Sequence, residues 1–321
     1  MRLLNKFRFL DKPVVEETPW YDRPDARERI ERDSIGTGLK RHALDFIEHG
    51  FVVFEGAISA DAVARARAEF VSWRARNATE LVQFEEPDKH LVRIVNLHAT
   101  LPALCELFST NPALALQDYL LGAETVLYTS LFFERGSAQP IHRDIPYFWT
   151  NPSNRYFGMW VALEDVDLEN GPLEVMVGGH KLPSISRETI GRRHFADPNS
   201  TPRISDELWY AYQNEVMTSC ERLGLERKPV LVSKGDTILW HPLLPHGGAA
   251  IRDFTRTRLS FVMHNVSRDT PVYQGDVFFN PAKRVPRRAH WNYRLDRGRH
   301  VALSGPMEIG TGRNYDFSKL T

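Results

Sequence analysis

The hydrophobic and polar positions divide the chain into a helical first part and a strand-rich second part. A short helical pattern covers residues 39–46 and ends at Gly50. After Ser59, apolar residues recur at three- and four-residue spacing, which predicts a helix that the Ser59 side chain caps. A further helical stretch is expected over residues 101–121, with a stop at the glycine that follows it. The first part of the chain therefore supplies helices.

From Glu124 onward the pattern changes to short apolar runs rich in Val, Leu, Phe, Tyr and Trp, each bounded by Gly, Pro, Asn or Asp. This pattern is typical of an all-β sandwich or barrel. The expected strands cover residues 50–54, 126–133, 156–163, 173–177, 230–232, 237–240 and 258–264. The rhythm breaks between residues 182 and 228, where one helical pattern at 206–223 lies in a polar segment. An insertion of this length predicts a lid or a binding element.

These changes suggest three regions. Residues 1–49 are expected to form an arm packed on the core, residues 50–265 a β domain with the lid-like insertion 182–228, and residues 266–321 a basic C-terminal extension. The cations of the extension are Lys283, Arg284, Arg287, Arg288, Arg294, Arg297 and Arg299, around Trp291 and Tyr293. They are expected to form either a solvated positive face or a binding site for a phosphate-bearing group.

Composition narrows the function classes. The 321 residues are 42% hydrophobic and 26% charged, and the formal net charge is zero. This balance gives no global electrostatic case for a nucleic-acid partner or an anionic membrane. The first ten residues interleave charged and apolar side chains, and no run is long enough to span a bilayer, so no membrane insertion is expected. Two cysteines, Cys105 and Cys220, suggest no disulfide framework and favour a cytoplasmic location.

The sequence Gln139-Pro140-Ile141-His142-Arg143-Asp144 carries the candidate chemistry. On an extended strand, His142 and Asp144 would point to the same side and could bind one ion. A third ligand could be His241 or His246, and His246 is favoured because two glycines follow it and permit close approach. Two histidines and one carboxylate form the facial triad of non-haem iron oxygenases. A histidine hydrogen-bonded to an aspartate in a structural turn is the alternative.

A ferrous triad leaves positions for a co-substrate such as 2-oxoglutarate, whose far carboxylate needs a cationic partner. Arginine is suited to this role because its planar fork binds a carboxylate with two hydrogen bonds. Arg256 and Arg258 lie ten and twelve residues after His246, on one face of the next expected strand. Either could bind the carboxylate, or both could be edge-strand charges that keep the sheet from aggregating.

Several motifs follow one another in order between residues 50 and 264. They are Gly50-Phe51-Val52-Val53, His142-Arg143-Asp144 with Tyr147-Phe148, Trp160, Asn170-Gly171-Pro172-Leu173 before Gly179-His180-Lys181, Gly235-Asp236, His246-Gly247, and Arg256 with Leu259-Ser260. With these motifs the chain resembles the phytanoyl-CoA dioxygenase-like (PhyH) branch of the iron(II)- and 2-oxoglutarate-dependent oxygenases. The resemblance implies a mainly β fold with flanking helices around a double-stranded β-helix, the jelly-roll core of the cupin class.

The resemblance also implies which residues form the site. It carries the metal ligands onto His142, Asp144 and His246, and the 2-oxoglutarate site onto Arg256 and Trp160. Family members often have a serine two residues after the distal histidine, where this chain has Gly248. Ser130 is a candidate to supply the missing hydroxyl. Halogenating relatives lack the carboxylate ligand, so Asp144 favours hydroxylation.

The implied activity is hydroxylation of an unactivated carbon with iron(II), 2-oxoglutarate and O2, giving succinate and CO2, and ascorbate is expected to stimulate it. The expected substrate is a small molecule, with an anionic or phosphate-bearing group favoured by Arg143, Tyr147 and Trp149 near the ligands. The alternatives are a non-catalytic cupin-like protein that binds metal or 2-oxoglutarate, and a non-oxidative cupin-type metalloenzyme. The sequence leaves the oligomeric state open.

Overall fold

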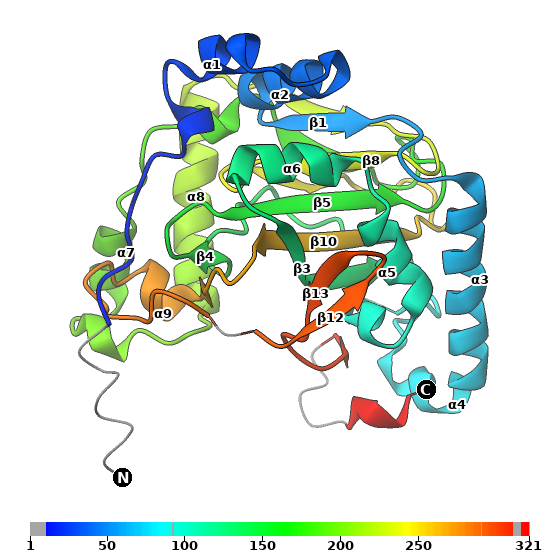
Figure 1. The fold of residues 1–321 in the computed structure, drawn as a ribbon. Coiled ribbons are helices and arrows are strands. Elements are labelled where there is room, and N and C mark those ends of the chain that lie inside the picture. The colour runs from blue at the N-terminus through cyan, green and yellow to red at the C-terminus, as the bar shows by residue number, and fades with distance from the viewer. Residues whose placement is uncertain (1–10, 92, 290, 311–315, 321) are drawn as a thin grey trace.

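The computed structural model describes residues 11–91, 93–289, 291–310 and 316–320, so the first ten residues of the arm and parts of the C-terminal extension lie outside the described residues. A large β-sheet forms the centre of the fold (Figure 1). Its strand order is β1 (Phe51–Phe54), β8 (Thr237–Trp240), β5 (Tyr156–Ala162), β10 (Ser260–Ser267), β3 (Thr125–Phe133), β13 (Arg299–Ala302) and β12 (Tyr293–Asp296), with β2 (Ile94–Val95) on β3 and β14 (Glu308–Ile309) on β2.

A smaller sheet packs against the large one. It has the order β7 (Arg227–Val230), β6 (Leu173–Met176) and β9 (His246–Gly248), and a separate pair joins β4 (Trp149–Thr150) to β11 (Val272–Tyr273). Side chains alternate along β5, so Trp160 contributes to the core that both sheets share while Phe157, Met159 and Val161 face the helices. The two sheets with a shared apolar interior form the jelly-roll core that the sequence predicts.

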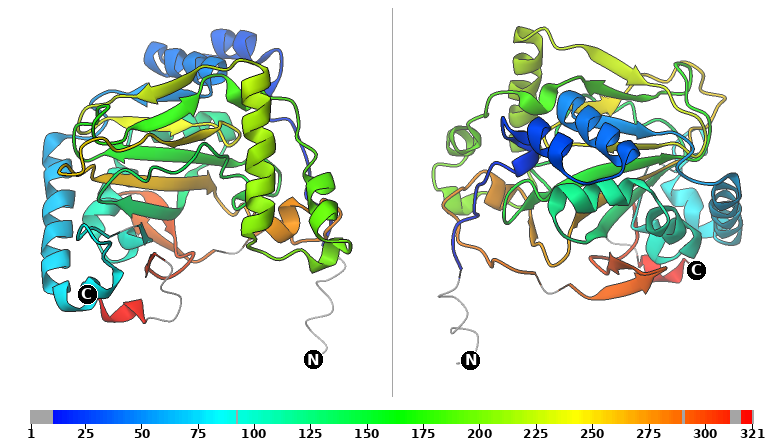
Figure 2. Two further views of the ribbon diagram at one scale, coloured as in Figure 1. Left: turned by 180° about the vertical axis from the view of Figure 1, so that it is seen from behind. Right: turned by 45° about the horizontal axis from the view of Figure 1, so that its top comes forward.

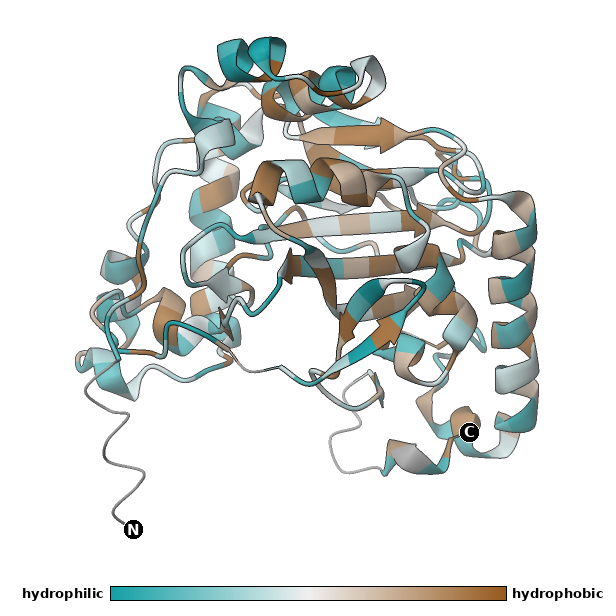
Figure 3. Ribbon diagram, in the orientation of Figure 1, coloured by the Kyte–Doolittle hydropathy of each residue, from teal (hydrophilic) through white to brown (hydrophobic). Residues whose placement is uncertain are grey.

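Helices cover the outer face of the large sheet (Figures 1 and 2). They are α1 (Ala26–Arg32), α2 (Thr37–His49), α3 (Ala60–Arg76), α4 (Ala78–Leu81), α5 (Pro102–Ser109) and α6 (Ala113–Leu121). The predicted cap is confirmed, because the Ser59 hydroxyl accepts a hydrogen bond from the Ala62 N–H at the start of α3. In Figure 3 strand β1 is mainly brown, whereas teal residues dominate α1 on the outside of the fold.

One predicted helix is wrong in its continuity. The stretch 101–121 contains two helices, because α5 ends at Ser109 and α6 begins at Ala113. Pro112 lies between them, where it lacks the N–H that a continuous helix would need. Two strand predictions are also shifted, since β7 ends at Val230 and β10 begins only at Ser260.

The insertion after β6 contains α7 (Arg187–His194) and α8 (Asp206–Arg222), and α9 (Gly275–Phe278) lies beside them. Helix α8 lies within the predicted range and buries the predicted face, with Leu208, Val216 and Cys220 at 0% exposure. Figure 2 shows α8 standing across one end of the sheets. Short 3-10 helices cover Trp20–Asp22, Val82–Phe84, Leu97–Ala99, Gly179–Lys181, Pro198–Ser200 and Phe317–Lys319.

The described part of the C-terminal extension uses much of its positive charge internally. Carboxylates pair with three of its cations, as Lys283 meets Asp276 at 2.7 Å, Arg299 meets Asp118 at 2.6 Å and Arg297 meets Glu106 at 3.2 Å. The last two pairs hold β13 and the turn before it against α6 and α5. All three pairs weaken the case for a phosphate-binding surface. Among the helices that the structure describes, none has both the length and the apolarity needed to cross a membrane.

Candidate metal centre

The main chain joins two of the predicted ligands directly. The His142 N–H donates to the His246 carbonyl at 2.8 Å, and the His246 N–H donates to the His142 carbonyl at 2.9 Å. His246 begins β9, whereas His142 makes only this isolated bridge and is followed by a bend. The extended strand expected around His142 is therefore wrong, yet His142 and Asp144 still point to one side, because their ligand atoms and those of His246 all lie within 4.8 Å of one another.

The three side chains are arranged to share one ion. Nε2 of His142 lies 3.3 Å from one Asp144 oxygen, and Nε2 of His246 lies 3.4 Å from the other. Nδ1 of each imidazole forms a hydrogen bond with a nearby carbonyl. His142 pairs with the Pro140 carbonyl at 2.8 Å, and His246 pairs with the Leu244 carbonyl at 3.0 Å. These hydrogen bonds favour the tautomer whose Nε2 lone pair is free for a metal. All three ligands are buried.

A buried tyrosine supports the carboxylate. The Tyr156 hydroxyl donates to Asp144 Oδ2 at 2.8 Å and lies 2.8 Å from Nδ1 of His264, which then donates to the phenol oxygen. Burial alone would raise the pKa of Asp144, but when both imidazoles are protonated the charge of His246 and the hydrogen bonds from both rings hold it well below its usual value. Burial, with the neighbouring carboxylate, raises the pKa of Tyr156 well above 10.0. Asp144 is thus ionised while Tyr156 stays a proton donor.

The other candidate ligand, His241, has a different partner. Its Nε2 lies 3.0 Å from a carboxylate oxygen of Asp22, and its Nδ1 accepts a hydrogen bond from the Leu243 N–H. The ring is 1% exposed and packs against Phe46 and Tyr21. The structure thus brings His246, rather than His241, to His142 and Asp144.

The ligands line a pocket of about 70 Å³ between the two sheets. Its other polar or aromatic lining residues are Phe133, Ser137, Gln139, Trp160, Trp240, Arg258 and His264. Arg258 is 3% exposed and donates to the Gly171 carbonyl at 2.7 Å, and its Cζ lies 5.4 Å from the centre of the Trp160 ring. Its Nε–H has no hydrogen-bond partner among the described residues. Burial lowers the pKa of Arg258 to about 10, so it remains a cation at neutral pH.

Arg256 is placed differently. Its Nη1 donates to both oxygens of Asp167 at 2.9 and 3.0 Å, and its side chain is 36% exposed. Because β10 begins only at Ser260, the strand face that Arg256 and Arg258 were expected to share does not form. Of the two arginines, the structure places Arg258 in the metal pocket and Arg256 at an exposed ion pair.

The hydroxyl near Gly248 does not come from Ser130. Ser130 lies on the side of β3 that faces the helices, and its Oγ is 2.6 Å from Nδ1 of His98. A side chain at Gly248 would instead collide with Ser137, because an ideal Cβ there would lie 2.7 Å from the Ser137 Oγ. The Ser137 hydroxyl thus occupies the space next to position 248. Ser137 has no signal in the sequence, because no local pattern brings a loop serine to that glycine.

The predicted substrate residues separate into two groups. Tyr147 stacks on Trp209 of α8 with ring centroids 4.8 Å apart, and Trp209 lies 5.6 Å from the His142 ring. Arg143 and Trp149 line a different cavity. Tyr156 and His264 were also missed, although strand alternation offered a clue, since both lie an even number of positions from inward-facing residues.

The sequence profile described as "Phytanoyl-CoA dioxygenase (PhyH)" matches residues 46–255, which is more than half of the chain. The chain belongs to this family. The predicted PhyH resemblance is thereby confirmed, and the metal ligands and Arg258 lie within or close to the matched range.

Curated PhyH relatives match part of their length. The mouse protein "Phytanoyl-CoA dioxygenase, peroxisomal" is 27% identical over 228 residues, which cover 62% of this chain and 60% of that protein. Mouse "Phytanoyl-CoA dioxygenase domain-containing protein 1" is 30% identical over 206 residues, covering 62% of this chain and 65% of that protein. The PhyH chain thus spans about 60% of the length of the first of these relatives.

Solved structures confirm the fold. EctD from S. alaskensis, determined with 2-oxoglutarate and 5-hydroxyectoine, superposes with a TM-score of 0.56 at 17% identity, covering 87% of this chain and 94% of that one. The epimerase SnoN, in complex with Fe3+, alpha ketoglutarate and nogalamycin RO, gives 0.55 at 21% identity, covering 82% and 98%. The predicted jelly-roll core is the architecture that these chains share with the PhyH chain.

Proposed function

We propose that this chain is an iron(II)- and 2-oxoglutarate-dependent dioxygenase that hydroxylates an unactivated carbon of a small molecule. Membership of the PhyH family and the two-histidine, one-carboxylate cluster support this activity. The observation that carries the proposal is the buried Arg258, an arginine without a carboxylate partner among the described residues in the pocket of the three ligands. A buried cation of this kind is costly unless an anion joins it.

The residues fit a ferrous ion. His142, Asp144 and His246 would hold it through two Nε2 atoms and one carboxylate, the donor set of non-haem iron sites. Bound there with 2-oxoglutarate and O2, iron would supply the oxidising chemistry that gives the hydroxylated product, succinate and CO2. The protein's part is to orient the ligands, which Pro140, Leu244 and Tyr156 do by hydrogen bonds, and to exclude water.

We assign the far carboxylate of 2-oxoglutarate to Arg258 in place of Arg256, whose guanidinium is already paired with Asp167. The Ser137 hydroxyl lines the same pocket and can donate a hydrogen bond to that carboxylate. Trp160 packs beneath the Arg258 guanidinium and would line the co-substrate site as predicted. A charged hydrogen bond in this dry pocket is worth about 1.5–3 kcal/mol.

The substrate would approach on the side of His142 where Tyr147 stacks on Trp209 of α8. These flat rings suit a small ring-bearing or apolar group, and we retain the prediction of an anionic or phosphate-bearing substrate. Residues 50–265, with 182–228 as lid, would be the oxygenase unit. A cytoplasmic location and stimulation by ascorbate remain predictions.

One assay separates this proposal from its alternatives. Anaerobically purified protein receives ferrous iron, 2-oxoglutarate and ascorbate, and succinate is measured after O2 is admitted, with and without a panel of small-molecule acids and phosphates. A dioxygenase releases succinate, faster with a substrate. A non-catalytic protein binds 2-oxoglutarate but forms no succinate. A non-oxidative metalloenzyme binds metal but has no affinity for 2-oxoglutarate. Either of the last two results would contradict the proposal.

A further inference from the structure

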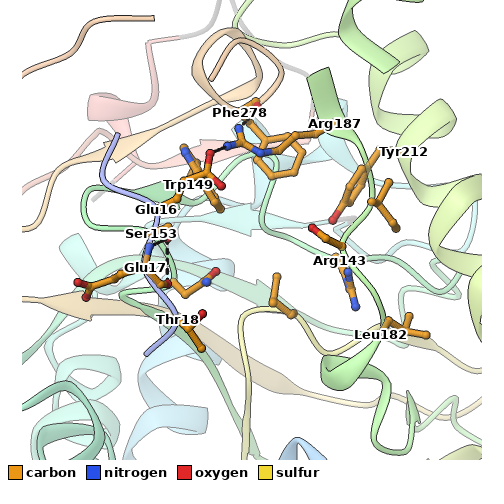
Figure 4. A pocket seen from close by; sticks show the side chains of 14 residues that line it. Glu16, Glu17, Thr18, Arg143, Trp149, Ser153, Leu182, Arg187, Tyr212 and Phe278 are labelled. Carbon is orange, nitrogen blue, oxygen red and sulfur yellow. Dashed lines mark hydrogen bonds and ion pairs between the residues drawn. The ribbon is translucent and has the colours of Figure 1, made fainter. Parts of the chain in front are cut away.

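A second cavity lies on the other side of the metal-ligand segment. Arg143 stands between two metal ligands in sequence, but its side chain lines a separate cavity of about 300 Å³. This cavity and the metal pocket have no lining residue in common. Figure 4 shows Arg143, Tyr212 and Leu182 across the cavity from Glu17 and Thr18 of the N-terminal arm.

Arg143 is a buried cation with little compensation. It is 3% exposed, and its Nη2 donates to the Gly179 carbonyl at 2.7 Å. Its Nε–H has no partner, and no carboxylate pairs with it, within the described part of the chain. Taking a guanidinium out of water costs several kcal/mol unless an anion meets it.

A second buried donor lines the same cavity. Trp149 is 5% exposed, and its indole N–H has no hydrogen-bond partner among the described residues. Arg187 of α7 lies over the Trp149 ring at 4.5 Å and pairs with Glu16 of the arm. Two residues that line the cavity therefore carry buried N–H groups without a partner among the described residues, beside a further guanidinium.

The remaining lining is partly polar and partly apolar, and its two carboxylates, Glu16 and Glu17, are already paired with Arg187 and Arg155. Leu182, Ile185, Leu243 and Phe278 contribute hydrocarbon and ring surface. A volume of about 300 Å³ is at the lower end of the range of small-molecule sites, which is roughly 300–1,000 Å³. A ligand that satisfies both parts has a compact oxyanion on an apolar or aromatic body.

We propose that this cavity is a second ligand site, which binds a small organic carboxylate or phosphate through Arg143 and Trp149. The occupant does not reach the metal pocket, because the backbone of His142, Arg143 and Asp144 separates the two. It acts on that segment instead, because Gln213 holds the Arg143 backbone through two hydrogen bonds, and the adjacent Tyr212 lines the cavity.

Calorimetry would test this site without turnover. Anaerobic protein saturated with ferrous iron and 2-oxoglutarate is titrated with benzoate, phenyl phosphate and the neutral benzyl alcohol. We expect the anions to bind at least about tenfold more tightly than the alcohol, as a charged hydrogen bond implies. The stronger of benzoate and phenyl phosphate identifies the oxyanion. Equal binding of all three would overturn the proposal.

Variants locate the site. Arg143→Gln and Arg187→Gln are expected to weaken anion binding by about tenfold or more, and Trp149→Phe by about fivefold, because it removes one N–H and keeps the ring. Arg192→Gln is the matched control on α7, since Arg192 is 58% exposed and its one ion pair among the described residues is with Glu188 of the same helix. Trp149→Phe and Arg187→Gln keep the test valid if Arg143→Gln does not fold.

Two outcomes would assign the anions elsewhere and overturn the proposal. Unchanged binding in both Arg187→Gln and Trp149→Phe would exclude the cavity. Loss of binding in Arg258→Gln alone would place the probes in the co-substrate pocket. Since no O2 is present, the site can be established even if no succinate is ever released, and the dioxygenase can be established even if the cavity binds nothing.

Discussion

The segment from His142 to Asp144 has a pocket on each side, and each pocket contains one arginine that is 3% exposed. On the metal side, charges of both signs are close together, because Asp144 faces two imidazoles. On the other side, Arg143 has the carbonyl of Gly179 and no carboxylate among the described residues. Alternate residues of one short segment can therefore belong to two sites with different charge balance, one suited to a metal and one to an anion.

The largest effect is expected from Asp144→Ala, which should weaken ferrous-ion binding at least about 100-fold. Even the loss of a residue that only supports a ligand costs roughly 10- to 100-fold in metal affinity. Arg143→Gln, whose side chain faces the other cavity, should keep the metal affinity within about threefold. Anaerobic metal titration measures both. A similar loss in the two variants would show that the two sides of the segment are not separate sites.

The next effect distinguishes the two neighbouring arginines. Arg258→Gln should raise the Kd for 2-oxoglutarate by about tenfold to 100-fold, because it removes a buried charged donor. Arg256→Gln is the matched control and should change the Kd by less than about twofold, because its pair with Asp167 is exposed. Titration of the anaerobic ferrous protein measures both constants. The reverse order would return the co-substrate to Arg256.

A smaller effect concerns the buried histidines on either side. Burial lowers the pKa of His264 to about 4 on the metal side and that of His180, close to Arg143, to about 2. Below pH 6.5 the unfolded chain binds protons at both positions, whereas the folded protein does not until it reaches these lower values. The free energy of unfolding should therefore fall as pH drops from 6.5 to 4, by about 1.4 kcal/mol per pH unit for each histidine.

Urea unfolding of the metal-free protein at several pH values tests this expectation. His180→Gln and His264→Gln should each reduce the pH slope by about one proton's share. A slope that neither variant changes would show that other groups determine the acid sensitivity.

The smallest effect separates the two serines. Ser137→Ala should raise the Kd for 2-oxoglutarate by about fivefold, since it removes one hydrogen bond worth about 1 kcal/mol. Ser130→Ala should leave that Kd unchanged and lower the free energy of unfolding, because the His98 Nδ1 would lose its partner. The same calorimetric and urea measurements report both. An effect of Ser130→Ala on the Kd, with none from Ser137→Ala, would contradict the placement.

Much of the fold could be predicted because its signals are local. The strand at 237–240 matches β8, and Ser59 caps α3 as expected. The two histidines of the candidate metal centre were also accessible, since a short motif pointed to His142 and the following glycines favoured His246. The break between α5 and α6 was available from Pro112. The prediction followed the apolar pattern on either side of Pro112 and therefore joined the two helices.

The remaining site residues depended on contacts that local patterns do not encode. The expected strand left Arg256 and Arg258 equally possible, and the family resemblance favoured Arg256 through its spacing to Leu259-Ser260. The two side chains differ only in the folded chain, where β10 begins at Ser260 and neither arginine lies on a strand. Ser137 approaches Gly248 from a loop more than a hundred residues earlier. The cavity that Arg143 lines forms only when Trp149 and α7 fold around it, so it could not be predicted from the sequence near Arg143.

The reciprocal main-chain hydrogen bonds between His142 and His246 make the spacing of the two imidazoles a property of the backbone. Exchanging side chains at these positions changes which atoms are offered to an ion, while the distance between the two attachment points is preserved. The site can thus acquire a new ligand set in single steps without rebuilding its scaffold. Among the described residues, Asp144 has no reciprocal main-chain hydrogen bonds to either histidine. A substitution at Asp144 would therefore alter the coordination shell most freely.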